Sequence, residues 1–288
     1  MTRSITSPDN QKTPGRSVGR DILRAVIPPA FWLGVWQLAA MWVGRKAIAA
    51  AWVAGDGAAL VKAVIEGKAL LLPGPLLVLR TLGELAVTPL LWQSAALSLV
   101  RIFSGFLGGA VLGGLLAAAC AAFRPARLLL TPAVGVIRAT PVASFIILLL
   151  LWVTTGLVPA VCAGLMVLPV VWGNVYKGII QTDPLLLEGA KTWRFGRWKT
   201  LRLVYLPSVL PYFASGCSTA LGLAWKAGVA AEVLCVPKLA IGSQVYYSKL
   251  YLETPSLFAW TITVLALSFL LDKIFGTLFR RMERGRGA

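Results

Sequence analysis

The stretch DPLLLEGAKTWRFGRWKTLRLVYLP, residues 183–207, is a basic segment between two long apolar runs. Asp183 followed by Pro184 is a strong helix start, because aspartate accepts hydrogen bonds from free amides and proline fits the first helical position. Residues 185–193 favour helix, Gly196 predicts a turn, and a second helical run leads to Pro207. The segment therefore predicts two short helices on the basic side of a membrane.

The composition of the whole chain is that of a membrane protein. Of its 288 residues, 58% are hydrophobic and 14% are charged, and the mean hydropathy is +0.78. Such values are typical of chains that cross the bilayer several times. The net charge of +17 does not predict a nucleic-acid surface, because most of the 28 lysines and arginines fall on one side of the predicted topology.

Hydropathy predicts an all-α integral membrane protein with six transmembrane helices, each near the length that crosses a bilayer. A basic cytoplasmic tail is expected at 1–24 and a single membrane domain at 25–288. The spans are expected at 25–44, 92–123, about 135–153, 160–180, 207–236 and 255–279, with the basic segment at 181–206. This order places both termini and the basic segment in the cytoplasm.

Several residue types limit the chemistry that the chain can perform. It has no histidine, and its four cysteines are widely spaced, so neither a metal site nor a catalytic residue is expected. It has no Gly-x-x-x-x-Gly-Lys-Ser/Thr loop to hold ATP phosphates. Gly105, Gly109 and Gly113 repeat at four-residue steps, which predicts a close contact between helices.

Four charged residues fall inside predicted spans, where lipid penalises charge: Arg101, Arg138, Lys226 and Glu232. Arg138 is expected near the inner end of its span, where it can snorkel. Lys226, beside Trp225, is expected in a pathway or at a dimer interface, with a buried ion pair as the alternative. Glu232 faces a different side of the helix from Lys226, so the two are not expected to pair within one helix, and pairing across helices or across a dimer stays open. For Arg101, a functional role and pairing at a helix contact are equally compatible with the sequence.

The basic segment resembles the cytoplasmic loop of permease subunits from binding-protein-dependent ABC importers. That loop reads Glu-Ala-Ala, three residues, Gly, nine residues, and Ile-x-Leu-Pro. The matching positions here are Glu188, Gly189, Ala190, Val204, Leu206 and Pro207. Gly189 replaces an alanine, and Arg194 stands where the family has its turn glycine, two residues before Gly196. The register of the turn is therefore open.

Other segments from about Leu71 onward resemble the nitrate/sulfonate/taurine branch of these permeases. They are LLPGPLLVL (71–79), SAALSLVRIFSGFLGG (94–109), GVIRATPVASF (135–145) and GLAWKAGVAAEVL (222–234). The resemblance implies a type I importer fold in a bacterial inner membrane, with the chain acting as a permease and not as an enzyme. It implies a permease homodimer, cytoplasmic ATPase subunits that bind ATP and Mg, and an external solute-binding protein.

The resemblance also implies a role for the loop and a class of solute. The ATPase contact would involve Asp183, Glu188, Gly189, Ala190, Trp193, Gly196 and Pro207. Leu186, Ala190 and Trp193 are spaced to share one apolar helix face that could dock in a groove. The solute would be small, such as nitrate, a sulfonate, taurine or a vitamin precursor. No cofactor is expected on this chain.

Two other classes of membrane protein remain as alternatives. A secondary transporter would need ion-coupling groups near the midplane or inverted repeats, and neither is evident in the sequence. A membrane scaffold or assembly factor would have no pathway, and its central loop would serve only for docking.

Overall fold

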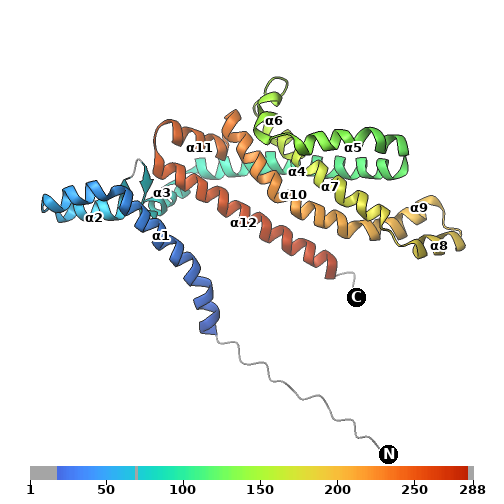
Figure 1. The fold of residues 1–288 in the computed structure, drawn as a ribbon, viewed down its shortest axis with the longest axis horizontal. Coiled ribbons are helices and arrows are strands. Elements are labelled where there is room, and N and C mark those ends of the chain that lie inside the picture. The colour runs from blue at the N-terminus through green and yellow to red at the C-terminus, as the bar shows by residue number, and fades with distance from the viewer. Residues whose placement is uncertain (1–17, 69–70, 285–288) are drawn as a thin grey trace, which may run out of the picture. The chain divides into compact units, whose positions relative to one another are not determined.

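The computed structural model describes residues 18–68 and 71–284, and these form two compact units that divide between Leu77 and Val78. Helices account for most of the described residues (Figure 1). Residues 1–17 of the expected cytoplasmic tail lie outside the described residues. From Val18 onward the backbone is already helical, so the first helix begins before the expected start at residue 25.

The first unit is a long helix followed by a short helix and a small strand pair. Helix α1 (Val18–Val53) continues beyond the expected end at residue 44, and α2 (Gly57–Glu66) starts at Asp56, whose carboxylate accepts from the Ala59 amide at 3.0 Å. Strands β1 (Gly67–Lys68) and β2 (Leu72–Pro73) pair antiparallel. The sequence predicted no strand. The Gln37 side chain donates to the Val64 carbonyl at 2.6 Å and ties α1 to α2.

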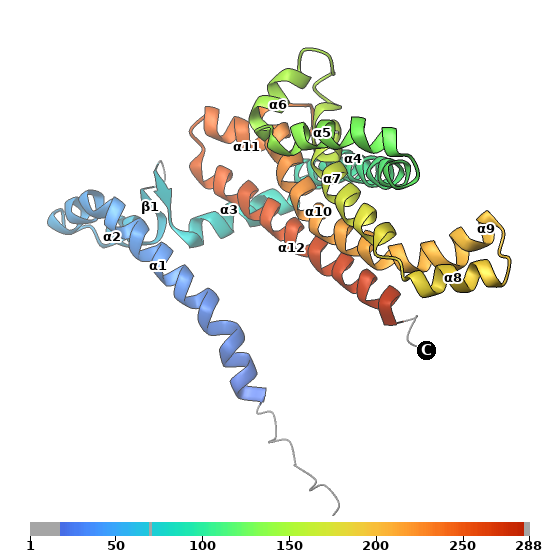
Figure 2. The same cartoon turned by 45° about the vertical axis from the view of Figure 1, so that its right-hand side comes forward.

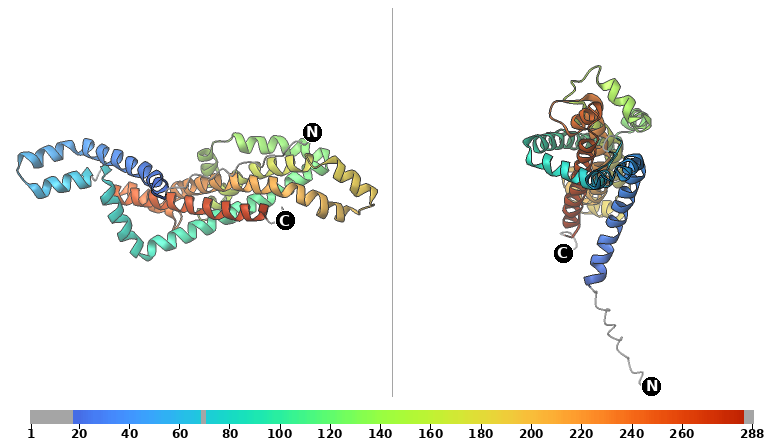
Figure 3. Two further views of the ribbon diagram at one scale, coloured as in Figure 1. Left: turned by 90° about the horizontal axis from the view of Figure 1, so that it is seen from below. Right: turned by 90° about the vertical axis from the view of Figure 1, so that its left-hand side faces the viewer.

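The second unit consists of helices joined by short turns, with no strand among its described residues. The remaining helices of the chain are α3 (Pro75–Val87), α4 (Pro89–Ala122), α5 (Arg124–Ala139), α6 (Val142–Leu149), α7 (Val158–Ile180), α8 (Pro184–Thr192), α9 (Arg197–Thr200), the π-helical turn η1 (Leu201–Tyr205), α10 (Leu206–Cys235), α11 (Ile241–Leu250) and α12 (Thr254–Arg284). Helix α7 packs lengthwise against both α4 and α10 (Figure 3).

The predicted glycine ridge lies in the contact between α4 and α7. A Cβ atom on Gly109 would overlap the backbone of Gly164, and one on Gly113 would lie 2.7 Å from the Leu168 carbonyl oxygen. Only glycine lets the two backbones approach this closely. The prediction of a close helix contact is confirmed.

The order of these contacts shows that α4 and α7 run parallel. Gly105 meets Ala160, and Gly109 meets Gly164, so residue numbers rise together along both helices. If both helices cross the membrane, the chain must cross back between them, and α5 and α6 are the elements available. These two helices are bent by 104° at the break before Val142. The break falls at Pro141, because proline has no amide to donate and disfavours helix at the residue before it. The expected third span is therefore a broken helix pair.

Length and apolar composition identify four candidate spans in the described part of the chain: Val26–Val53, Pro89–Ala122, Val158–Ile180 and Thr254–Thr277. The bent pair α5–α6 makes a fifth if it counts as one span. Helix α10 is 30 residues long but more polar, since it carries Lys226 and Glu232. It would be the sixth, so the count of six remains a prediction.

Helix α12, the last helix of the second unit, packs along α10 (Figure 2). Trp225 on α10 is buried, and its indole Nε1 donates to the Val264 carbonyl of α12 at 3.2 Å. Phe275 of α12 contacts two aromatic rings of α4, with centroid distances of 5.7 Å to Phe103 and 6.0 Å to Phe106. These apolar contacts form one continuous core with α7.

Candidate functional site

The basic segment forms a pair of helical arms at the end of α10 that is remote from α11 (Figure 1). The first arm is α8, which begins where the sequence predicts. The Asp183 carboxylate accepts from the Leu185 amide at 2.9 Å, and Pro184 occupies the first helical turn. Glu188 is exposed, and a Cβ atom on Gly189 would meet nothing within 4 Å. This side of α8 is open.

The turn between the two arms lies at Arg194, not at Gly196 as predicted. Arg194 has a φ of +49°, its amide donates to the Lys191 carbonyl at 2.9 Å, and the Phe195 amide donates to the Ala190 carbonyl at 2.8 Å. This bond pattern is the Schellman motif, which usually has glycine at the left-handed position. Gly196 is extended, with a φ of −65°. The turn therefore keeps the family's register, and arginine adopts the conformation that glycine favours.

The second arm is continuous with the long helix α10. Helix α9 passes into η1 and then into α10 without a break, and the Leu206 amide donates to the Leu201 carbonyl, as in a π-helical turn. Pro207 directly follows this π-helical turn, and because proline has no amide, one backbone hydrogen bond of the continuous helix is missing there. A force applied to the second arm can therefore act directly on α10.

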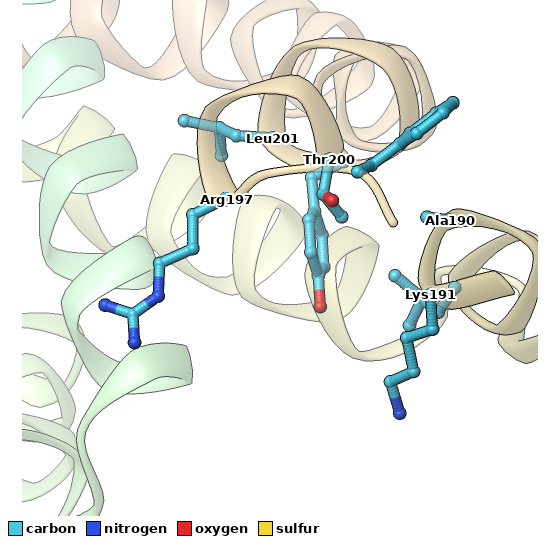
Figure 4. A pocket seen from close by; sticks show the side chains of 8 residues that line it. Ala190, Lys191, Arg197, Thr200 and Leu201 are labelled. Atoms are coloured by element: carbon cyan, nitrogen blue, oxygen red, sulfur yellow. The ribbon is translucent and has the colours of Figure 1, made fainter. Parts of the chain in front are cut away.

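A hollow of about 600 Å³ separates the two arms (Figure 4). It is lined by Leu187, Ala190, Lys191, Phe195, Arg197, Thr200, Leu201 and Tyr205. The Lys191 and Arg197 side chains extend from opposite arms toward the same side of the opening (Figure 4).

The expected shared face of Leu186, Ala190 and Trp193 is wrong. Ala190 is buried at the hollow, with 5% of its surface exposed, whereas Trp193 is 78% exposed and Leu186 is 52% exposed. The sequence did not single out Trp198 on the second arm, which is 73% exposed. Each arm thus presents one exposed tryptophan to solvent or to a partner.

At the opposite end of α10, Glu232 is fully buried and holds three elements together. The Ser98 hydroxyl of α4 donates to Glu232 Oε2 at 2.8 Å, and the Gly242 amide of α11 donates to the same oxygen at 3.2 Å. Ser98 in turn accepts from the Ile241 amide at 3.0 Å. The first amides of α11 are therefore capped by side chains from two other helices, since its own N-cap residue, Ala240, supplies no side-chain bond.

Arg101 completes this buried cluster from α4. Its guanidinium Nη1 lies 4.0 Å from Glu232 Oε1, and it donates to the carbonyls of Lys238 at 2.9 Å and Leu239 at 3.2 Å. Gly242 must be glycine for this packing, because a Cβ atom there would overlap Glu232. The cluster fixes the loop and the short helix α11 onto α4 and α10.

The two other charges are placed differently from Arg101 and Glu232. Arg138 is exposed in the last turn of α5, beside the break between α5 and α6. Lys226 is exposed on α10, while its neighbour Trp225 faces the core. Within the described residues, no ion pair joins Lys226 to Glu232.

Residues 109–284 match the model of the family "Binding-protein-dependent transport system inner membrane component". The chain belongs to this family. These permeases are membrane subunits of ABC importers, and the loop register found at Arg194 agrees with that assignment. The fold and the sulfonate and taurine branch predicted from the sequence are confirmed.

Two relatives and one solved structure illustrate the similarity. The permease is 26% identical to the putative aliphatic sulfonates transport permease protein SsuC of Bacillus subtilis (strain 168), over 96% of this chain and 92% of that protein. It is 25% identical to the taurine transport system permease protein TauC of Escherichia coli (strain K12), over 76% of this chain and 81% of that protein. Its fold resembles the crystal structure of an amino acid ABC transporter with histidines, with a TM-score of 0.56 and 20% identity over 70% of this chain and 97% of that chain.

Proposed function

We propose that this permease forms the membrane pathway of an ATP-driven importer in the bacterial inner membrane. In this proposal two copies form a homodimer that receives a small solute from an external solute-binding protein. Cytoplasmic ATPase subunits bind ATP and Mg and drive the cycle, while this chain supplies no catalytic residue. The observation that carries the proposal is the pair of helical arms, since the second arm is continuous with α10.

The arms would couple ATP hydrolysis to movement of the spans. The open side of α8 at Gly189 allows a groove of the ATPase to approach the helix backbone. Exposed Trp193 and Trp198 would add apolar area to the contact. When the ATPase subunits close, they would push the arms, and α10 would move as a rigid body with α7 and α12, against which it packs.

The names of the relatives favour a sulfonate as the transported group. SsuC is named for aliphatic sulfonates and TauC for taurine, which is itself an amino sulfonate. Nitrate or another small solute is compatible with the same fold. We therefore propose a small solute that carries an acidic group.

Variants at the open side of α8 test the coupling role. Gly189→Trp fills the space in which the ATPase groove would lie, and Glu188→Lys places like charge beside Lys191. Both should insert into the membrane normally, because neither residue belongs to a span. Recovery of the co-expressed ATPase and uptake of labelled taurine or ethanesulfonate by the full importer should both fall. Gly135→Trp is the matched control, since its Cβ atom also meets nothing within 4 Å but lies on α5.

The outcomes separate the proposed function from its alternatives. Full ATPase recovery and full uptake by both α8 variants would show that α8 is not the coupling contact. Uptake that persists in cells without the ATPase would indicate a secondary transporter. ATPase recovery without uptake of any tested solute, even with the solute-binding protein present, would favour an assembly factor.

A further inference from the structure

We infer that Lys226 makes one face of α10 a cationic passage and thereby selects a small anion as the transported solute. This inference rests on the proposed function. It means that the permease itself selects the solute by its charge, in addition to any selection made by the solute-binding protein.

A polar face runs along α10 and includes Lys226. Its other members are Ser208, Ser215, Thr219 and Gly222, which follow one another at helical spacing. Ser215, Thr219 and Lys226 are exposed, although α10 is packed on its other sides by α4, α7 and α12. Lipid makes an exposed polar face costly, so this face is expected to meet water or protein.

The register between α10 and α7 gives the depth of Lys226. Gly216 meets Asn174, and Gly178 meets Tyr212, so the two helices run antiparallel and Lys226 lies level with Gly164. Gly164 is six residues from the start of α7 at Val158. At about 1.5 Å per residue, that is about 9 Å from one end of the span and about 24 Å from the other. Lys226 is therefore inside the hydrocarbon layer, which is about 30 Å thick.

The chain offers no counter-charge to Lys226 among the residues that the structure describes. The other charged residue of α10 is Glu232, which is six positions away, faces a different side of the helix and is already bonded to Ser98 and Gly242. The described side chains make no hydrogen bond or ion pair with Lys226. A lysine held at this depth without a partner needs an anion or water beside it.

A second copy of the chain supplies no counter-charge if the α10 faces of the two copies meet. In that arrangement the partner brings a second Lys226, and the face contains no carboxylate. Like charges in a region of low dielectric repel each other, which disfavours a dry contact at this position. A small anion between the two faces would satisfy both lysines. The charge of the face therefore favours a solute as the occupant over a protein surface.

The test measures the charge preference of the passage with two thiol reagents and needs no knowledge of the natural solute. Gly222→Cys places a thiol one helical turn from Lys226, where a Cβ atom meets nothing within 4 Å. The complex of permease and ATPase is held in lipid nanodiscs, so that reagents reach both sides. Its labelling rates are measured with sulfonatoethyl methanethiosulfonate, which is anionic, and trimethylammonioethyl methanethiosulfonate, which is cationic. The complex without the introduced cysteine gives the background, because the four native cysteines are buried.

The ratio of the anionic to the cationic labelling rate is expected to fall about tenfold on Lys226→Gln, which corresponds to about 1.4 kcal/mol of lost attraction. Lys226→Arg keeps the charge and should keep the ratio. Phe269→Cys, on the exposed face of α12, should react with neither reagent if that face meets lipid. The ratio is compared only between complexes that retain their ATPase, so a misfolded variant is recognised before labelling.

Three results would overturn the inference. The cysteine at position 222 could react with neither reagent. The ratio of its anionic to its cationic labelling rate could stay the same on Lys226→Gln. The cysteine could also form a disulfide with a second copy while both reagents are excluded. In each case recovered ATPase would leave the proposed function intact. A permease without the introduced cysteine that recovers no co-expressed ATPase would instead count against the proposed function, and this result is seen before any labelling.

Discussion

Ser98 on α4 and Glu232 on α10 are 134 positions apart in the sequence, yet the serine hydroxyl donates to the buried carboxylate at 2.8 Å. Each of the two side chains also accepts from a first-turn amide of α11, Ser98 from Ile241 and Glu232 from Gly242. A helix that would otherwise begin with unpaired amides is thereby anchored to the bundle. The carboxyl group of Glu232 thus joins α4, α10 and α11.

Removal of the Ser98 hydroxyl should destabilise the permease by about 1–3 kcal/mol, because the Ile241 amide loses its buried acceptor and Glu232 loses a donor. The measurement is thermal unfolding of the purified Ser98→Ala variant. Ser104→Ala is the matched control, since Ser104 is exposed on the same helix and bonds only to the Arg101 carbonyl. Equal unfolding temperatures for the two variants would show that the cap contributes little.

Arg194→Gly should stabilise the helical arms. Arginine in the left-handed region costs about 1–2 kcal/mol, whereas glycine adds about 0.4–1 kcal/mol of unfolded-state entropy that folding must overcome. The net gain is therefore between about 0 and 1.6 kcal/mol, and proteolysis of the loop in the inserted permease should slow accordingly. Gly196→Ala serves as the comparison, because Gly196 has an ordinary negative φ and open space around it. Faster cleavage of Arg194→Gly would mean that the arginine side chain makes a contact worth more than the strain.

Local sequence patterns predicted those features of the permease that are determined by residues close together in the chain. The N-cap at Asp183 and the glycine ridge at Gly109 follow from side-chain chemistry and helical spacing, and both are present in the structure. The partners of Glu232 could not be predicted, because Ser98 and Gly242 are brought to it by tertiary packing alone. The place of the turn was missed for another reason. Glycine is the usual left-handed residue, and here the packing of the arms places Arg194 in that conformation.

The adjacent glycines of α4 should respond in opposite ways to a larger side chain. Gly109→Leu should disrupt the contact with α7, because its Cβ atom would overlap the Gly164 backbone, which cannot move aside as a side chain can. Gly108→Leu should be tolerated, since its Cβ atom meets nothing within 4 Å. The yield of folded permease after mild detergent extraction should fall for Gly109→Leu and stay unchanged for Gly108→Leu. Comparable yields would indicate that α4 and α7 can separate at little cost.

The direction of each helix in unit 2 leads to a prediction about topology. Helices α4 and α7 run parallel, and α10 runs antiparallel to α7, so the ends of these helices at residues 158 and 235 belong to one side of the membrane. The positive-inside rule makes that side external, because the basic arms lie at the other end of α10. A bent pair α5–α6 that crosses the membrane would place the segment before α7 outside as well.

Single cysteines in a chain whose four native cysteines are replaced by alanine can test this topology in intact cells. An impermeant maleimide should label Lys249→Cys on α11 and Thr155→Cys before α7, since both residues are exposed and on the predicted external side. A cysteine at Asp56 should be labelled too if α1 crosses once. Lys199→Cys on the second arm should be labelled only after the membrane is opened. Labelling of Lys199→Cys in intact cells would contradict the six-span order. Protection of Thr155→Cys together with labelling of Lys249→Cys would contradict the parallel order of α4 and α7, because residues 158 and 235 would then lie on opposite sides of the membrane.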